Sequence, residues 1–250
     1  MRRLLIPCAL VLALAALGRA DDAADAKAVV EKALKARGGV DNLAQYKADV
    51  LKIKGAVHVS GLDIDFTGEI SFQQPDKSRT VIEGTVMGTN FKSTRVVNGD
   101  KGWIDDPQGA RDMSKEELAE AREAHNANAI GRLAVLTDKA YTLSTVGELK
   151  VGDKEAVGIL VKRKGYRDVS LFFDKKTHLL LKSETRVKDP QGGGDTDFTQ
   201  EAFYDDYKKV GDLQVAHKLT IKRDGKAFLE SEATEFKPEE KLDDGLFAKP

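Results

Sequence analysis

Hydrophobic and polar positions alternate with a period of two in many short blocks of this chain. The clearest block runs from Leu62 to Phe72, where apolar side chains or glycine occupy every second position. Such alternation is typical of strands with one buried and one hydrated face. A Ser60-Gly61 turn separates this block from the preceding one, which predicts a hairpin. The pattern therefore predicts a mainly β protein.

The same alternation recurs along most of the chain, interrupted by turn residues such as Asn98-Gly99 and Asp224-Gly225. Strands are expected at 50–59, 62–72, 77–85, 89–97, 102–105, 140–150, 155–164, 168–174, 179–188, 196–210, 214–223 and 227–236. A long antiparallel sheet of about eleven or twelve strands must curl rather than stay flat. The expected fold is an antiparallel half-open β-barrel with an N-terminal helix and a mid-chain helical insertion.

Two segments have the helical period instead. The first has its apolar side chains at Ala26, Val29, Val30, Ala33 and Leu34, and Gly38-Gly39 is expected to end it. Ser114 and Glu117 have the spacing of a capping box and predict the start of the second helix. This helix is polar at first and then apolar, and we expect it to continue, bent near Gly131, through Leu136.

Residues 1–20 have the pattern of a secretory signal peptide. Arg2 and Arg3 precede an apolar run over 4–17, and Gly18 and Ala20 are the small residues expected at a cleavage site. The run is shorter than the roughly 20 residues that span a bilayer. Cleavage after Ala20 would remove Cys8, the single cysteine, and leave 21–250 as one exported or periplasmic domain without disulfides or thiol chemistry.

Charge and candidate chemistry narrow the function classes. The chain has 40 Lys and Arg against 41 Asp and Glu, with both signs interspersed, which does not favour nucleic-acid binding. Its histidines, His58, His125, His178 and His217, lack metal-site spacing, and no nucleophile motif is present. We therefore expect no catalytic residue, no metal and no cofactor.

Two carboxylate pairs are weaker enzymatic or metal-binding candidates. Asp63 and Asp65 share a strand face and could act as acid and base, although a solvated strand face is the favoured explanation by several-fold. Asp195 and Asp197 follow Gly192-Gly193-Gly194, but the regularly spaced oxygen ligands of a calcium loop are missing.

Four short stretches of the sequence resemble those of a known family. They are Ala-Arg-Gly-Gly at 36–39, Asn-Gly-Asp-Lys-Gly-Trp at 98–103, Leu-Phe-Phe-Asp-Lys-Lys-Thr at 171–177 and Leu-Asp-Asp-Gly-Leu-Phe at 242–247. With the order of helix, strands, helical insertion and strands, they make 26–250 resemble the LolA/LolB-like family of periplasmic lipoprotein-sorting proteins. The resemblance implies an unclosed barrel whose apolar concave face, covered by a helical lid, shields acyl chains from water.

The resemblance also implies which residues bind the ligand. Candidate cavity or lid residues are Phe66, Phe72, Phe91, Trp103, Ile130, Leu133, Leu136 and Phe172. The implied partners of this monomer are lipid or lipoprotein acyl chains and a membrane-bound donor or acceptor protein. The residue types leave an alternative open, because any β-barrel needs apolar side chains to fill its own core. An envelope sensor or protein-interaction domain on the same fold, without stored lipid, is the second hypothesis.

Overall fold

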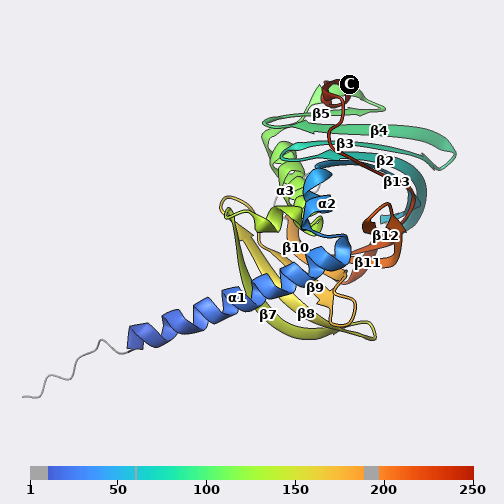
Figure 1. Ribbon diagram of the computed structural model, residues 1–250. Helices are drawn as coiled ribbons and strands as arrows, with labels where there is room; N and C mark the ends of the chain where they lie inside the picture. Colours follow the sequence, from blue (N-terminus) through green and yellow to red (C-terminus); the bar gives the residue numbers. More distant parts are fainter. Residues whose placement is uncertain (1–10, 60, 189–196) are drawn as a thin grey trace, which may run out of the picture.

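One antiparallel sheet of 13 strands forms most of the molecule (Figure 1). The computed structural model describes residues 11–59, 61–188 and 197–250, with side chains from Asp22 onward. The strands are β1 (Ala48–Val59), β2 (Leu62–Gln73), β3 (Lys77–Val86), β4 (Thr89–Asn98), β5 (Lys101–Asp106), β6 (Gly109–Asp112), β7 (Tyr141–Val151), β8 (Lys154–Arg163), β9 (Val169–Asp174), β10 (Leu180–Lys188), β11 (Asp197–Val210), β12 (Leu213–Arg223) and β13 (Lys226–Glu239). Their spatial order is β6-β5-β4-β3-β2-β1-β13-β12-β11-β10-β9-β8-β7.

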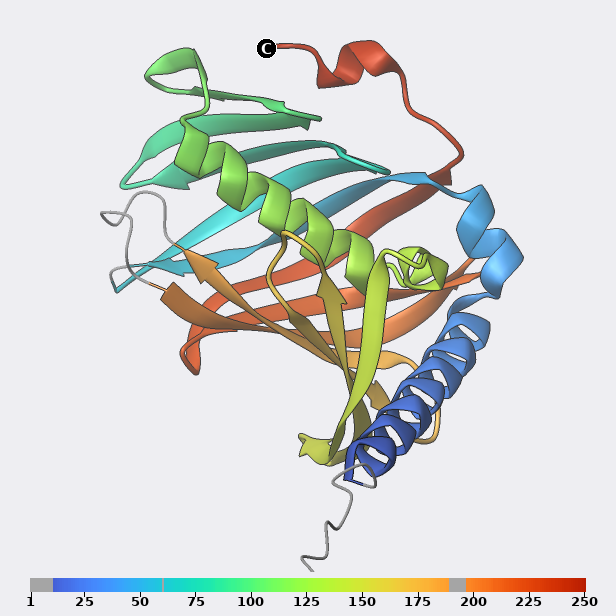
Figure 2. The ribbon, with the colours of Figure 1, turned by 90° about the vertical axis from the view of Figure 1, so that its left-hand side faces the viewer.

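The helices are α1 (Val11–Arg37), α2 (Val40–Gln45), α3 (Lys115–Gly131) and the short 3-10 segments η1 (Ala134–Thr137) and η2 (Asp244–Phe247). The sheet curls around α3, which crosses its concave side, while α1 lies against the β7 end (Figures 1 and 2). The predicted half-open antiparallel barrel with helical parts is confirmed.

Three local predictions need correction. The structure adds β6, a strand of four exposed residues whose sequence shows no alternation. A short helix, α2, follows Gly38-Gly39, where the sequence analysis predicts no helix. The mid-chain helix does not continue through Leu136, because α3 ends at Gly131 and Leu133 adopts a φ of 70° before η1.

The break after α3 has a packing reason. On a continuous helix, Leu136 would be rotated by about 120° from Ile130 and would leave the face that Ile130 buries. The left-handed conformation of Leu133 changes the direction of the chain instead. Ile130, Leu133 and Leu136 are consequently 0%, 2% and 5% exposed in one hydrophobic cluster.

The register defines an inner and an outer face of the sheet. The ring of Phe72 on β2 stacks on His125 of α3 with 4.4 Å between centroids, so Phe72 points inward. Alternate residues of β2 share that side, and Phe66 is among them. Thr67 and Glu69 therefore point outward.

Glycines permit the strong curvature of the sheet. A Cβ atom on Gly55 would lie 2.0 Å from the carbonyl oxygen of Glu230 on β13. On Gly84 it would lie 2.6 Å from the carbonyl oxygen of Asp65 and 2.8 Å from the ring of Phe91. Only glycine fits at these two positions without movement of the backbone.

The main core fills the β7 end of the barrel. It joins one side of α1 and the segment after α3 to the inner faces of β7, β8 and β9. The side chains of Leu34, Ile159, Leu171 and Phe173 are at most 2% exposed there. We call this region the filled end.

The C-terminal segment covers part of the outer face. Phe247 is fully buried, its carbonyl oxygen accepts a hydrogen bond from Asn98 (3.3 Å), and the ammonium of Lys77 lies 5.9 Å from its ring centroid. The stretch 242–247, which carried part of the family resemblance, therefore packs on β3 and β4.

The N-terminal helix α1 is anchored near its described start. The carboxylate of Asp22 accepts hydrogen bonds from the backbone N–H (2.9 Å) and the hydroxyl of Thr145 on β7. These bonds lower the pKa of Asp22. Among the described residues, no helix is both long and apolar enough to cross a membrane. Residues 1–10, with Cys8, lie outside the described residues, and the signal peptide stays a prediction.

Candidate ligand-binding groove

A groove of about 390 Å³ lies between α3 and the inner face of the sheet. Helix α3 contributes small side chains to its lining, at Ala121, Ala124 and Ala127. The sheet contributes apolar side chains at Ile104, Val169, Ala202, Leu219, Ile221 and Phe228, and the ring of Tyr204. The groove exists because α3 crosses the concave face without filling it.

The N-terminus of α3 is fixed by the capping box predicted from the sequence. The backbone N–H of Glu117 donates to the hydroxyl of Ser114 (3.1 Å), and the N–H of Ser114 donates to the Glu117 carboxylate (2.8 Å). Arg111 binds the same carboxylate through two nitrogens at 2.7 and 2.8 Å. The hydrogen bonds from Arg111, assisted by Ser114, lower the pKa of Glu117 to about 2.

The middle of α3 is tied to the segments around β9 and β10. Arg167 forms a bidentate ion pair with Glu120, and its backbone N–H donates to Glu123 (3.0 Å). The backbone N–H of Lys188 also donates to Glu120 (3.1 Å). Burial acts to raise the pKa of Glu120, but these hydrogen bonds outweigh it and the pKa is lowered.

The C-terminal end of α3 is tied to β1. Arg132 donates to both oxygens of the buried Asp49 carboxylate, at 2.7 and 2.9 Å. Its guanidinium carbon lies 3.8 Å from the ring centroid of Phe72, which also stacks on His125. Burial, together with the nearby Arg132, lowers the pKa of His125 to about 4. His125 is therefore neutral at pH 7 and donates a hydrogen bond to the carbonyl oxygen of Pro75 (2.9 Å).

The floor of the groove includes one buried hydroxyl. Tyr204 and Ser183 share a hydrogen bond of 3.1 Å between their side-chain oxygens. Burial raises the pKa of Tyr204, so the phenol stays protonated at neutral pH. The hydroxyl is satisfied by Ser183, which leaves a largely apolar surface around it.

The predicted ligand-binding residues are distributed over several parts of the molecule. Ile130, Leu133 and Leu136 belong to the filled end, and Phe72 contacts the C-terminal part of α3. Phe66 and Phe91 share the inner face on β2 and β4, next to Gly84. Trp103 pairs with Val96 and points outward, as does Phe172, whose ring lies below the ammonium of Lys182.

None of these residues belongs to the described lining of the groove. Their role in binding stays a prediction. The residues that the sequence analysis missed include three alanines spaced three apart on α3, at 121, 124 and 127. That spacing is the one available signal, because small side chains along one side of a charged helix leave room beneath it.

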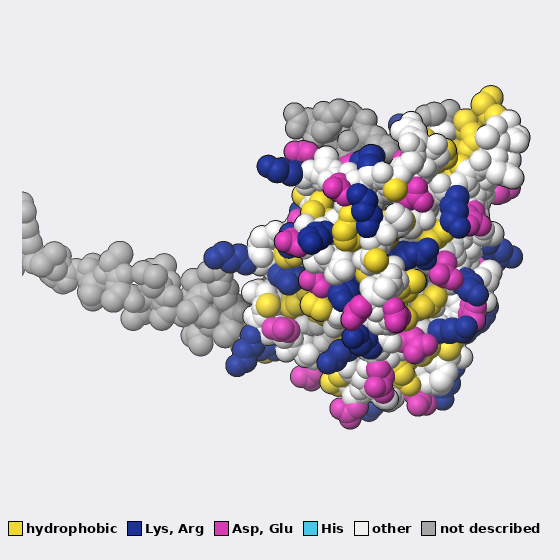
Figure 3. Space-filling view, turned by 90° about the horizontal axis from the view of Figure 1, so that it is seen from above, with side chains coloured by type: hydrophobic (Ala, Val, Ile, Leu, Met, Phe, Trp, Pro, Cys, Tyr) yellow, Lys and Arg dark blue, Asp and Glu magenta, His cyan; other side chains and the backbone are white. Residues whose placement is uncertain are grey.

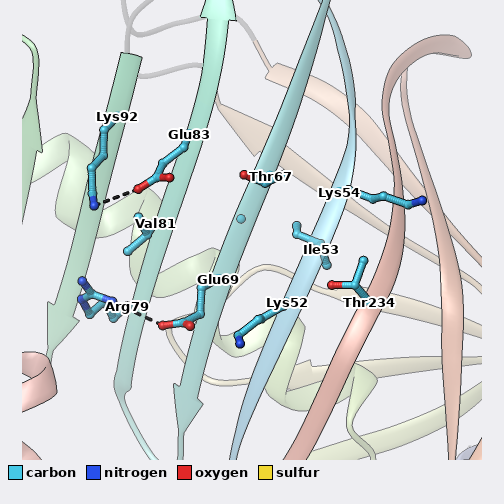
Figure 4. Close-up of a pocket in the computed structure, with 11 residues that line it drawn as sticks. Lys52, Ile53, Lys54, Thr67, Glu69, Arg79, Val81, Glu83, Lys92 and Thr234 are labelled. Carbon is cyan, nitrogen blue, oxygen red and sulfur yellow. Dashed lines mark ion pairs between the residues drawn. The ribbon is translucent and has the colours of Figure 1, made fainter. Parts of the chain in front are cut away.

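A second depression, on the outer face, differs in chemistry (Figure 4). Its walls are exposed or half-buried charged side chains in cross-strand ion pairs, such as Lys92 with Glu83 (2.8 Å) and Arg79 with Glu69 (3.7 Å). Solvated pairs of this kind are usual on a hydrated sheet face. The surface seen in Figure 3 likewise intersperses cationic and anionic side chains.

The other candidate chemistry lies apart from the groove. Asp63 accepts a hydrogen bond from His58 on the neighbouring strand (2.7 Å), and His217 donates to the carbonyl oxygen of Val215 (2.9 Å). Asp195 and the triple glycine lie outside the described residues. Within the described part of the chain, no three His, Cys, Asp or Glu side chains are grouped to hold a metal ion.

Solved structures of the same architecture exist despite low sequence similarity. No family model matches the sequence, and no curated protein matches it either. A LolA superfamily protein from Nitrosomonas europaea superposes with a TM-score of 0.60 at 11% identity, over 90% of this chain and 97% of the other. The chain has a LolA-like fold.

Two further structures agree with the LolA-like fold. A DUF1329 family protein from Desulfovibrio piger gives a TM-score of 0.57 at 14% identity, covering 89% of this chain and 97% of its own. A domain from Vibrio parahaemolyticus, described as an outer membrane lipoprotein-sorting protein, gives 0.55 at 12% identity, covering 91% and 97%. In this LolA-like fold the groove occupies the concave side of the sheet, beneath α3.

Proposed function

We propose that this protein is an exported carrier that binds a hydrophobic ligand, a lipid or the acyl chains of a lipoprotein, in the groove beneath α3. The observation that carries the proposal is an apolar concave surface that the protein's own side chains leave unfilled. The LolA-like fold supports it, because one structure with this fold is described as a lipoprotein-sorting domain.

The size and chemistry of the groove suit such a ligand. Its volume of about 390 Å³ lies within the range of about 300–1,000 Å³ typical of small-molecule sites. Each methylene group moved from water into an apolar site contributes about 0.8 kcal/mol. A chain of ten methylenes would therefore gain about 8 kcal/mol before the entropic cost of binding. This role needs no catalytic residue and no cofactor.

The construction of α3 explains how an empty groove is maintained. Apolar surfaces normally close on one another, since burial stabilises the folded chain. Here ion pairs at Glu117, Glu120 and Arg132 hold the helix to β6, to the loop before β9 and to β1. Between these attachments the helix presents alanines, which are too short to reach the opposite wall.

The test is binding of a neutral fluorescent naphthylamine to the protein purified without detergent. We expect saturable binding that tetradecanol displaces. Ala121→Trp should block it by filling the groove. Ala119→Trp is the matched control, because Ala119 is exposed on the same helix and does not line the groove.

Two results would count against the proposal. One is a protein that binds neither the fluorophore nor any aliphatic alcohol. The other is binding that Ala121→Trp and Ala119→Trp impair equally, which would place the site elsewhere or reflect a folding defect.

Export is a separate part of the proposal. We propose that cleavage after Ala20 releases 21–250 to the periplasm, where a membrane-bound donor or acceptor protein exchanges the ligand. Intact-mass measurement of the exported protein should give the mass of 21–250. A mass that retains the first 20 residues would contradict release by cleavage.

A further inference from the structure

We propose that the ligand is a single-chain amphiphile with an anionic head group, and that Arg95 binds this head group beside the N-terminal half of α3. This inference rests on the proposed function and specifies the class of ligand. The head group is a carboxylate or a phosphate, because a guanidinium recognises both.

The charge of the groove differs from that of the whole protein. Its lining includes five cationic and three anionic side chains, whereas the whole chain has a net charge of −1. Two of the three carboxylates, Glu117 and Glu120, are already bound bidentately by arginines. Arg167 is itself used in binding Glu120, and Arg186 pairs with Asp197 (3.8 Å), but the lining as a whole has more cationic than anionic side chains.

Arg95 is the first candidate for contact with the head group. It lies on the inner face of β4 opposite Ile104 of β5, lines the groove and is exposed. Among the described residues it has no hydrogen bond or ion pair of its own. Glu117 is near enough for Arg95 to lower its pKa, but Arg111 and the backbone of Ser114 already bind that carboxylate.

Arg223 faces the groove from the opposite wall, on β12. Its guanidinium carbon lies 3.6 Å from the ring centroid of Phe228, and its Nε donates to Gln200 (3.3 Å). Phe228 and Gln200 also line the groove. The stacking and the hydrogen bond fix the plane of this guanidinium, which adds positive charge to this wall of the groove.

The remaining lining suits one aliphatic chain. Charged side chains of α3 that face the groove end at Glu123, and the helix then contributes Ala124, Ala127 and Asn128. The opposing floor there is formed by Val169, Ala202 and Tyr204, whose hydroxyl is bound to Ser183. The groove is thus charged along one half of α3 and apolar along the other, as an amphiphile requires.

The size of the groove favours one chain over several. Its volume of about 390 Å³ is near the lower end of the range for ligand sites, about 300–1,000 Å³. A neutral alcohol would use the apolar part of this volume but would leave Arg95 without a counter-ion. A cationic amphiphile would meet repulsion from Arg95 and Arg223.

The experiment compares C14 ligands that differ only in the head group. Tetradecanoate, tetradecyl phosphate, tetradecanol and tetradecyltrimethylammonium each displace the neutral fluorophore from the detergent-free protein, below their micelle-forming concentrations. We expect at least one of the two anions to bind about tenfold more tightly than the alcohol, as a charge-assisted hydrogen bond provides. The two anionic arms distinguish a carboxylate from a phosphate.

Variants assign the effect to the head-group site. Arg95→Gln should weaken anion binding about tenfold and leave the affinity for tetradecanol unchanged. Arg95→Lys should retain part of the affinity for the anion, because the positive charge remains but the planar guanidinium is lost. Arg79→Gln is the control, since Arg79 lies on the outer face and pairs with Glu69.

The outcomes separate the two proposals. Equal affinity for the alcohol and both anions, or anion binding that Arg95→Gln leaves unchanged, overturns the anionic head group while the carrier function stands. Absence of binding by every C14 ligand contradicts the carrier function and this inference with it.

Discussion

The inner face of the same sheet is packed solid at one end and hollow beneath α3. At the filled end Ile159 and Leu171 are 0% exposed and lie against α1 and the segment after α3. Beneath α3, Leu219 and Ile221 are only half-buried and line the groove. Both regions have inward-facing branched aliphatic residues, so the difference comes from the helices that cover them.

The covering helices differ in the side chains that they contribute. The filled end receives Val30, Leu34 and Ile130, whose side chains reach into the sheet. The groove receives Ala121, Ala124 and Ala127, which do not. Large apolar residues on a covering helix therefore produce a core, and small ones held in place by ion pairs produce a binding site.

The strongest test of this comparison is a matched pair of truncations. Ile159→Ala should lower the free energy of unfolding by about 2–5 kcal/mol, since it leaves a cavity in a dense core. Ile221→Ala should cost about 1 kcal/mol or less, because its side chain is only partly buried. Urea unfolding measures both. Similar losses would mean that the groove is packed in solution.

The stability of the protein should depend on pH through His125, which lies between the filled end and the groove. The folded-state pKa of His125 is about 4, below the usual value of about 6.5. Between pH 4 and pH 6.5 the unfolded chain therefore binds more protons at this residue than the folded chain does. The contribution of neutral His125 to the free energy of unfolding is full above pH 6.5 and falls as the pH decreases to 4. The slope contributed by His125 is up to about 1.4 kcal/mol per pH unit.

The control for that slope is His125→Gln, examined by urea unfolding from pH 7 to pH 4. The variant should lose this part of the pH dependence while retaining a polar side chain. An unchanged slope would assign the acid response to other groups.

The strong curvature of the sheet depends on the glycine at position 55. A methyl group there would meet the Glu230 carbonyl oxygen at 2.0 Å, so Gly55→Ala should cost about 1–3 kcal/mol through overpacking. Gly131→Ala is the comparison, because its nearest contact would be an ordinary 3.6 Å to the Tyr204 hydroxyl. Thermal unfolding should show a clear loss for the first variant only.

The smallest effect concerns the attachment of α3 at Glu117. The pKa of Glu117 is about 2 in the folded protein, below the value of about 4.3 for an unfolded glutamate. The ionised carboxylate therefore stabilises the folded state fully above about pH 4.3, and this stabilisation is lost as the pH falls to 2. Arg111 is exposed, so solvent screens the ion pair and its contribution to stability is small. Glu117→Gln should reduce the pH dependence of the free energy of unfolding between pH 4.5 and 2. A profile identical to that of the wild type would show that this ion pair does not contribute to stability.

Much of the fold could be predicted from local sequence signals. Period-two blocks such as 62–72 became strands, and the Ser114–Glu117 spacing became a capping box. The left-handed turn at Leu133 could not be predicted, since leucine rarely adopts that conformation. Packing of Leu133 and Leu136 against the distant α1 decides the outcome there.

The groove was harder to predict than the fold. Alternation shows that a strand has two unlike faces, but it does not show which of them lies inside the barrel. Trp103 faces outward because the outer side of this part of the sheet is also covered, as the 1% exposure of its partner Val96 shows. Arg95 and Arg223 line the same groove because the whole sheet curls, and no local signal encodes that curl.

The strand order has a consequence for how the protein folds. Every described pairing except one joins strands that are consecutive in the chain, and the exception joins β1 to β13, with Ala48 opposite Glu239. Two meanders, β1 to β6 and β7 to β13, can therefore form from local contacts, whereas the seam between them closes a loop of almost the whole chain and is slow to form. The walls of the groove come from both meanders, with Arg95 on one and Arg223 on the other. The binding site is consequently among the last parts of the molecule to be completed, and a ligand stabilises only chains in which the seam has closed.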